Sequence, residues 1–293
     1  MTMRSFQHFA VIDWSGEAVA NPKGLAAAHL TAGQSRPALY RPHGRWSREA
    51  LILELLRHAE AGSDILIGLD LSPGLPFVDL DAYFPGWSDS PGDARSLWRL
   101  VDELSESDRH LGVRGFLSHP VVREHFLHQT HTGLYYHGGG GRLRKCETAQ
   151  RAMSLTPYSC FRLIGSSQVG KSSLTGMRVL HRLNGRIPVW PFDPVPESGP
   201  MIVEIYTSLP AREAGILPRN RSKIGTVEEL EASLRFFGCK LPLEPVALDD
   251  DHATDALATV AWLRLAADKP ELWLPREREP NACRTEGWTF GVP

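Results

Sequence analysis

Short apolar runs that end in an acidic residue stand out in the first quarter of the chain. Residues 9–15 (Phe-Ala-Val-Ile-Asp-Trp-Ser) and 64–70 (Asp-Ile-Leu-Ile-Gly-Leu-Asp) have the length and composition of buried strands. Weaker runs at 24–31 and 38–41, separated by turn residues, predict two more strands. A helical period of apolar residues follows over 47–62, beginning at a serine that can cap a helix and ending at a glycine. The predicted order of this part is βββαβ.

The rest of the chain has a loosely patterned middle and a regular second half. Runs at 187–190 and 201–206 predict strands, and two helical patterns follow them at 226–237 and 250–267. Before those strands, loops that carry Pro and Gly separate three predicted helices at 93–106, 120–129 and 172–183.

We therefore predict a single α/β domain over residues 1–293, with a mixed sheet in βββαβαβα order. Its core comprises about residues 5–76 and 187–268. A large helical and loop insertion, about residues 77–186, separates the fourth and fifth core strands. Residues 269–293 are rich in Pro, Arg and Glu, and we expect them to form a surface tail.

Composition narrows the class of protein. The chain has 293 residues, 42% of them hydrophobic and 23% charged, with a net charge of −2, which excludes a strongly basic protein that coats nucleic acid. The long apolar stretch from Ala256 to Leu263, which contains one threonine, is far shorter than the roughly 20 residues that cross a bilayer. Near the start, Asp13 interrupts the apolar residues before a signal peptide could form, so we expect a cytoplasmic protein. The four cysteines are too far apart to predict a zinc site or a disulfide framework.

Charge is unevenly distributed within the predicted insertion. Residues 137–186 contain nine basic residues against Glu147 alone, so this segment has a net charge of +8 and the rest of the chain −10. Such a patch can bind a phosphate backbone, but it can equally be a solvated helical face. The candidate contacts to substrate phosphate are Lys171, Arg142, Arg144 and Lys145.

Four acidic residues lie where local structure does not require a charge. Asp13 and Asp70 end apolar strands, Glu204 interrupts one, and Asp255 lies in an apolar helix. In a βββαβ sheet the first and fourth strands are parallel neighbours, so Asp13 and Asp70 would be adjacent, and a helix across that end would add Asp255. Three carboxylates at one point require a cation, and oxygen ligands suit Mg²⁺ or Mn²⁺. Such a cluster can support hydrolysis of a phosphodiester.

Each of these acids also has a purely structural interpretation. Asp13 and Asp70 both precede good turn residues, and Glu204 can pair with an arginine such as Arg212. Asp251 lies one turn before Asp255 and shares its helix face, but a helix N-terminus also favours negative charge. His252 would lie beside the acids and could move protons.

Four segments together resemble a known family. They are Val11-Ile-Asp-Trp-Ser-Gly16, Ile67-Gly-Leu-Asp-Leu-Ser-Pro-Gly74, Ile202-Val-Glu-Ile-Tyr206 and Asp251-His-Ala-Thr-Asp-Ala-Leu257. In this order they look like the conserved blocks of the predicted nucleases with a ribonuclease H fold, domain of unknown function 429. Two departures are the absence of a proline directly after Tyr206 and the large insertion.

The resemblance implies a ribonuclease H-like core related to Holliday-junction resolvases. It implies that acids on the first strand, the fourth strand and the last helix bind divalent metal, roles that fall here on Asp13, Asp70 and Asp255. Glu204 and Asp251 would be further participants in catalysis. The expected activity is a Mg²⁺- or Mn²⁺-dependent nuclease acting on nucleic acid, and a junction-cutting role would predict a homodimer.

A second motif supports different chemistry. Residues 165–172 (Gly-Ser-Ser-Gln-Val-Gly-Lys-Ser) match the phosphate-binding pattern G-x-x-x-x-G-K-[ST] and precede a predicted helix. They predict a nucleotide-binding phosphotransferase or ATPase that uses Lys171. In such folds, however, the loop follows the first core strand, whereas Phe161 to Ile164 is a marginal strand late in the chain. A third possibility is a nucleic-acid-binding module without catalysis.

Overall fold

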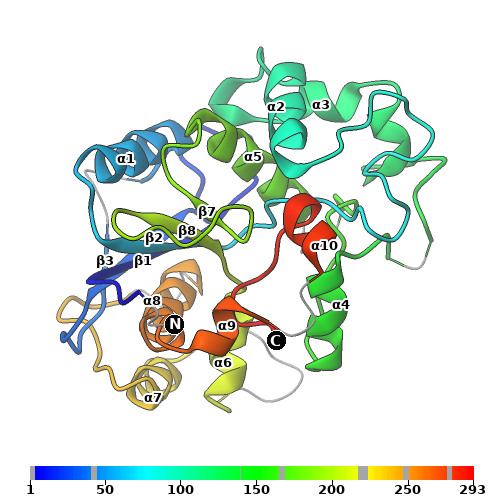
Figure 1. Cartoon of the computed structure of the whole chain (residues 1–293). Coiled ribbons are helices and arrows are strands. Elements are labelled where there is room, and N and C mark those ends of the chain that lie inside the picture. The colour runs from blue at the N-terminus through cyan, green and yellow to red at the C-terminus, as the bar shows by residue number, and fades with distance from the viewer. Residues whose placement is uncertain are drawn as a thin grey trace.

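The protein is an α/β fold built on a mixed six-stranded sheet (Figure 1). The computed structural model describes residues 4–40, 45–138, 140–164, 169–216, 224–246, 251–275 and 279–293. The strand order is β3-β2-β1-β4-β8-β7. These strands are β1 (His8–Asp13), β2 (Ala26–Thr31), β3 (Ala38–Leu39), β4 (Ile65–Leu69), β7 (Val189–Trp190) and β8 (Met201–Glu204). A hairpin of β5 (Leu127–His128) and β6 (His131–Thr132) forms a separate small sheet.

The pairing of the strands confirms the predicted start of the fold. β1 is antiparallel to β2 and β2 to β3, whereas β1, β4, β8 and β7 run parallel to one another. The expected parallel neighbours β1 and β4 pair with Ile12 opposite Leu69. β8 lies directly beside β4, and the short β7, which precedes it in the chain, extends the sheet at the edge.

Most predicted helices occur within a few residues of their expected bounds. The helices are α1 (Arg48–Glu60), α2 (Ala94–Leu104), α3 (Arg114–Ser118), α4 (Lys145–Ala152), α5 (Val169–Arg182), α6 (Ser208–Glu213), α7 (Val227–Phe236), α8 (Asp251–Ala266), α9 (Pro270–Trp273) and α10 (Pro280–Thr285). The hydroxyl of Ser47 caps α1, as expected, and the Asp93 carboxylate and the Thr226 hydroxyl cap α2 and α7. No helix among the described residues has both the length and the apolar character to cross a membrane.

One predicted helix is wrong. Residues 120–129 form a short 3₁₀ turn over Val122–His125 and then the strand β5. The chain leaves the helical path at Phe126 because Leu127 pairs through both its N–H and its carbonyl with the backbone of Phe161 and Leu163. This long-range pairing has no signal in the local pattern.

Alternating residues of the strands pack into two hydrophobic cores, one on each face of the sheet. Ile12, Ile67 and Leu69 pack on the face covered by α1 and α5, whereas Val11 and Leu66 pack on the face covered by α8. Figure 1 shows α1, α2 and α5 above the sheet, with α6, α7, α8 and α9 below it. Each side chain at the end of a strand therefore belongs to one face or the other.

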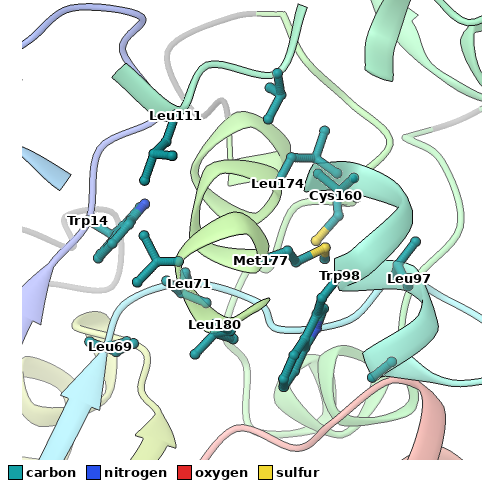
Figure 2. Close-up of a cluster of buried hydrophobic side chains, with 14 of the residues drawn as sticks. Trp14, Leu69, Leu71, Leu97, Trp98, Leu111, Cys160, Leu174, Met177 and Leu180 are labelled. Carbon is teal, nitrogen blue, oxygen red and sulfur yellow. The ribbon is translucent and has the colours of Figure 1, made fainter. Parts of the chain in front are cut away.

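The insertion is part of the core on the α1 face. Helix α5 passes through its centre, where Leu174, Met177 and Leu180 contact residues of the sheet and of α2 (Figure 2). Trp14, from the end of β1, donates its indole N–H to the Thr175 hydroxyl at 3.1 Å. Trp98 of α2 is 1% exposed in the same cluster. The insertion thus fixes the position of the loops at the ends of β1 and β4.

The predicted surface tail is wrong for its last part. Trp288, Phe290 and Val292 are at most 1% exposed and belong to the core on the α8 face. The Glu286 carboxylate, also 1% exposed, accepts hydrogen bonds from the backbone of Phe77 and Lys145. The alternation of apolar residues after Gly287 is a strand-like signal that the high content of Pro, Arg and Glu obscured.

Candidate functional site

Asp13 and Asp70 meet at the carboxyl end of the parallel strands. Asp13 is the last residue of β1, and Asp70 follows β4 and donates its backbone N–H to the carbonyl of Ile12 at 3.0 Å. Asp13 is 5% exposed. In the alternation of the strands, Asp13 falls with Val11 on the α8 face, and Asp70 falls there with Leu66. The sheet therefore brings the two carboxylates together, as the sequence predicted.

Helix α8 supplies the third carboxylate from across the same end of the sheet. Asp255, one turn into the helix, is 6% exposed and lines the same cleft as Asp13 and Asp70. His252, three residues earlier, has its Nδ1 2.9 Å from Oδ2 of Asp13. The helix packs across β1 and β2, so both side chains are held against the end of β1.

Burial and mutual repulsion make this group of acids electrostatically costly. The pKa of Asp70 is raised well above its usual value, first by burial and then by the charges of Asp13 and Asp255. The hydroxyl of Thr207 acts in the opposite direction, because it donates to Oδ2 of Asp70 at 3.1 Å and favours the ionised form. The carboxylate of Asp70 therefore has one fixed donor and two like charges near it.

The three acids line a cleft of about 950 Å³ between the core and the insertion. Its walls come from the loop after β1, the start of α5, the loop before α6 and the segment that precedes Ser159. Among the described residues, no three His, Cys, Asp or Glu side chains already stand in the geometry of a bound metal ion. The oxygen donors of Asp13, Asp70 and Asp255 are of the type that Mg²⁺ and Mn²⁺ use.

Glu204 has a different environment from the three aspartates. It lies opposite Leu69 in the sheet register, so its side chain lies on the other face from Asp13 and Asp70. Its two oxygens accept from the Arg144 guanidinium at 2.6 and 2.8 Å, and the Thr289 hydroxyl donates to it at 2.6 Å. Glu204 lines the cleft, but its charge is already compensated within the protein. The structure thus favours the predicted alternative of an arginine partner, with Arg144 in that position.

Arg144 and Arg142 bind carboxylates and carbonyls of the protein itself, and Arg144 also lines the cleft. Arg144 is 1% exposed and also donates through Nε to Glu147 at 3.0 Å. Arg142 is 7% exposed and binds the Asp79 carboxylate and the carbonyls of Ala82 and Tyr83. Both guanidinium groups use their donors inside the protein, which leaves little for a substrate.

The two lysines predicted to contact phosphate differ in their position relative to the cleft. Lys145 lies 3.3 Å from Glu279 and does not line the cleft. Lys171 does line the cleft, from the first turns of α5. Asp251 does not line it, and its carboxylate lies 3.6 Å from Nε2 of His252.

The match to a nucleotide-binding loop lies partly outside the described residues, since 165–168 are among those left undescribed. Phe161 to Leu163, which precede it, form a bridge with Leu127 and, among the described residues, do not belong to the main sheet. A Cβ on Gly170 would approach the Cys160 carbonyl to 2.1 Å, so this glycine is required for packing. A Cβ on Gly16 would likewise approach the backbone N of Ser172 to 2.5 Å, which places the loop after β1 directly on α5.

Sequence reasoning missed several residues of the cleft. Thr207, which holds Asp70, gave no signal because a threonine after a strand is common. Glu147 was noted only as a charge, although it is 3% exposed beside Arg144. Tyr158 and Tyr206 both line the cleft, and both contribute an aromatic ring near the acids. Their position depends on the path of the insertion, which the local pattern does not contain.

Comparisons of the chain with protein-family models, with curated proteins and with solved structures gave no match.

Proposed function

We propose that this chain is a divalent-metal-dependent nuclease with a ribonuclease H-like core, which hydrolyses phosphodiester bonds of nucleic acid. The observation that carries the proposal is the meeting of three carboxylates in one cleft, from the end of β1, the residue after β4, and α8; those of Asp13 and Asp255 are buried. Charged groups are rarely buried without a role or a partner. The resemblance of the four sequence segments to predicted nucleases implies the same three aspartates.

The topology of the sheet supports the ribonuclease H-like assignment. The antiparallel meander of β1, β2 and β3 and the parallel pairing of β1 with β4 agree with the predicted βββαβ arrangement, and β8 lies parallel beside β4. The helix that carries the third acid lies across β1, where the two strand-end acids meet. The insertion is an addition to that core, and the short β7 extends the sheet at its edge.

The chemistry of the residues fits a divalent cation. Asp13, Asp70 and Asp255 would hold it, because a cation relieves the repulsion that raises the pKa of Asp70. A divalent cation bound there supplies Lewis-acid stabilisation of the phosphate and activation of a water. Thr207 fixes the orientation of Asp70, and His252 that of Asp13, so both carboxylates are held in place before substrate arrives.

The nucleotide-binding alternative has weaker support. In the part of the chain that the structure describes, the residues directly before 165 do not belong to the main sheet, and Gly170 has a packing role that does not require a phosphate. Lys171 belongs to the same cleft as the aspartates, so its charge can serve a nucleic-acid phosphate there.

A cleavage assay tests the proposal. Labelled single-stranded, duplex, hybrid and junction substrates are incubated with the protein in Mg²⁺ or Mn²⁺, and Asp70→Asn and Asp255→Asn are compared with wild type. Asp268, an exposed aspartate, provides the matched control Asp268→Asn. We expect metal-dependent cutting that both cleft variants lose by at least about 100-fold and that the control retains. Absence of cutting with either metal on every substrate would refute the nuclease, and binding without cutting would identify a non-catalytic module.

A further inference from the structure

Most of the basic side chains in residues 137–186 are paired with a carboxylate. Six of the nine lie within 4 Å of one. These ion pairs are Arg142–Asp79, Arg144–Glu204, Lys145–Glu279, Arg178–Asp102, Arg182–Asp102 and Arg186–Glu60. The first, second and fourth of these cations are buried, whereas the other three form pairs at the surface.

Of the remaining three cations, one lines the cleft and another lies against a tyrosine that lines it. Lys171 lines it, and the guanidinium of Arg162 lies over the ring of Tyr158, 5.8 Å from the ring centre. Within the described part of the chain, neither has a carboxylate within 4 Å. Arg162 is held in place because its neighbours Phe161 and Leu163 hydrogen-bond to the backbone of Leu127.

Tyr158 is the exposed aromatic residue of this wall. Its surface is 43% exposed and its ring lines the cleft, although Ser159, Cys160 and Phe161, which follow it, are at most 1% exposed. The backbone that follows Tyr158 is thus anchored in the core, whereas the ring itself remains exposed. Tyr158 lines the same cleft as Asp70 and Asp255.

We propose that the cleft binds a single-stranded polynucleotide, with one base stacked on Tyr158 and the flanking phosphates facing Arg162 and Lys171. The proposal rests on the proposed function only for the position of the cut, because binding itself does not require cleavage. Stacking on an aromatic ring with cations along the backbone is how proteins bind unpaired strands without sequence preference.

The chemistry of stacking selects against an intact duplex. A base inside a duplex has both faces covered by its neighbours, so the ring of Tyr158 is accessible only to a base that is unstacked on one side. A guanidinium over one face of the ring leaves the second face, and the exposed surface of Tyr158 provides room for a base. A single strand passing Tyr158 would lead toward Asp70 in the same cleft.

The test measures base stacking directly and without cleavage. An oligothymidylate with one 2-aminopurine is titrated with the full chain in EDTA, and the fluorescence quenching that stacking produces gives the affinity. We expect Tyr158→Ala to weaken binding about 5- to 100-fold, and Tyr158→Phe, which keeps the ring, to stay near wild type. The matched control is Phe236→Ala, which removes a 56% exposed ring on α7 outside the cleft. Lys171→Ala should reduce the salt dependence by about one phosphate contact.

The outcomes separate this proposal from the nuclease. No binding of the oligonucleotide, or equal quenching by wild type and Tyr158→Ala, overturns the single-strand site even if the protein cuts DNA. Equal affinity for the same sequence in a duplex also overturns it. Conversely, Tyr158-dependent binding together with no metal-dependent cleavage would preserve the site and refute the nuclease. A matching ribonucleotide strand determines whether the site discriminates RNA from DNA.

Discussion

Arg144 provides the sharpest test of how the cleft is supported. Its guanidinium donates to both oxygens of Glu204, to Glu147 at 3.0 Å and to the Ser72 hydroxyl at 2.9 Å. The side chain is 1% exposed, and the carboxylates of Glu147 and Glu204 are 3% and 4% exposed. Arg144→Met keeps much of the apolar volume but leaves two buried carboxylates without their shared cation.

The expected cost follows from the desolvation of those carboxylates. Removing one partner of a buried pair costs about 3–5 kcal/mol of unfolding free energy. Two carboxylates depend on this arginine, and the Thr289 hydroxyl and one backbone N–H remain as donors, so we expect about 4 kcal/mol. The loss should become smaller at acidic pH, because the uncompensated charge on buried Glu147, whose pKa burial already raises, can then be removed by protonation.

Urea unfolding followed by tryptophan fluorescence measures this loss. Arg162→Met is the matched control, since Arg162 has no carboxylate within 4 Å among the described residues, and it should cost less than about 1 kcal/mol. Replacing Glu147 and Glu204 by Gln in the Arg144→Met background should restore much of the stability. Near-normal stability of Arg144→Met together with weaker nucleic-acid binding would refute this structural role. It would instead indicate that Arg144 contacts the substrate phosphates.

Three further predictions concern Asp70 in the cleft, the buried His125, and Gly170 at the start of α5. Asp70→Asn should raise the unfolding free energy in EDTA by about 1 kcal/mol, because it removes a buried charge beside two others, whereas excess Mg²⁺ should stabilise only wild type; a destabilised variant in EDTA would contradict this. Burial lowers the pKa of His125 to about 4. The unfolded chain therefore binds more protons than the folded chain between about pH 6.5 and 4. The free energy of unfolding should decrease as the pH is lowered through that window, by up to about 3 kcal/mol. His125→Phe should flatten this part of the profile of urea midpoint against pH, and an unchanged slope would show that His125 does not cause it. Gly170→Ala should cost about 1–3 kcal/mol without any nucleotide, because the new Cβ meets the Cys160 carbonyl, whereas normal stability with lost ATP binding would favour a nucleotide loop.

The central part of the fold was predictable because its signals are local. The apolar runs that end at Asp13 and near Asp70 define β1 and β4, and the βββαβ order makes them parallel neighbours. From that adjacency and the apolar helix around Asp255, the sequence predicts three acids at one end of the sheet. The structure places all three in one cleft.

The partners of the charged residues could not be predicted in the same way. Arg144 and Glu204 are 60 positions apart, and Arg142 meets Asp79 across a similar separation, so no local pattern links them. A +8 segment suggested a phosphate surface, but most of its cations are used to fix the insertion and the helices around it. The face on which Glu204 lies depends on its register with Leu69, which only the assembled sheet defines.

The most direct test of the proposed metal site is a calorimetric titration of the protein with Mn²⁺. We expect wild type and the control Asp268→Asn to bind the ion, and Asp70→Asn and Asp255→Asn each to lose at least about 10-fold in affinity. Absence of binding to wild type, or equal binding by Asp70→Asn, would contradict a metal site formed by the three cleft aspartates.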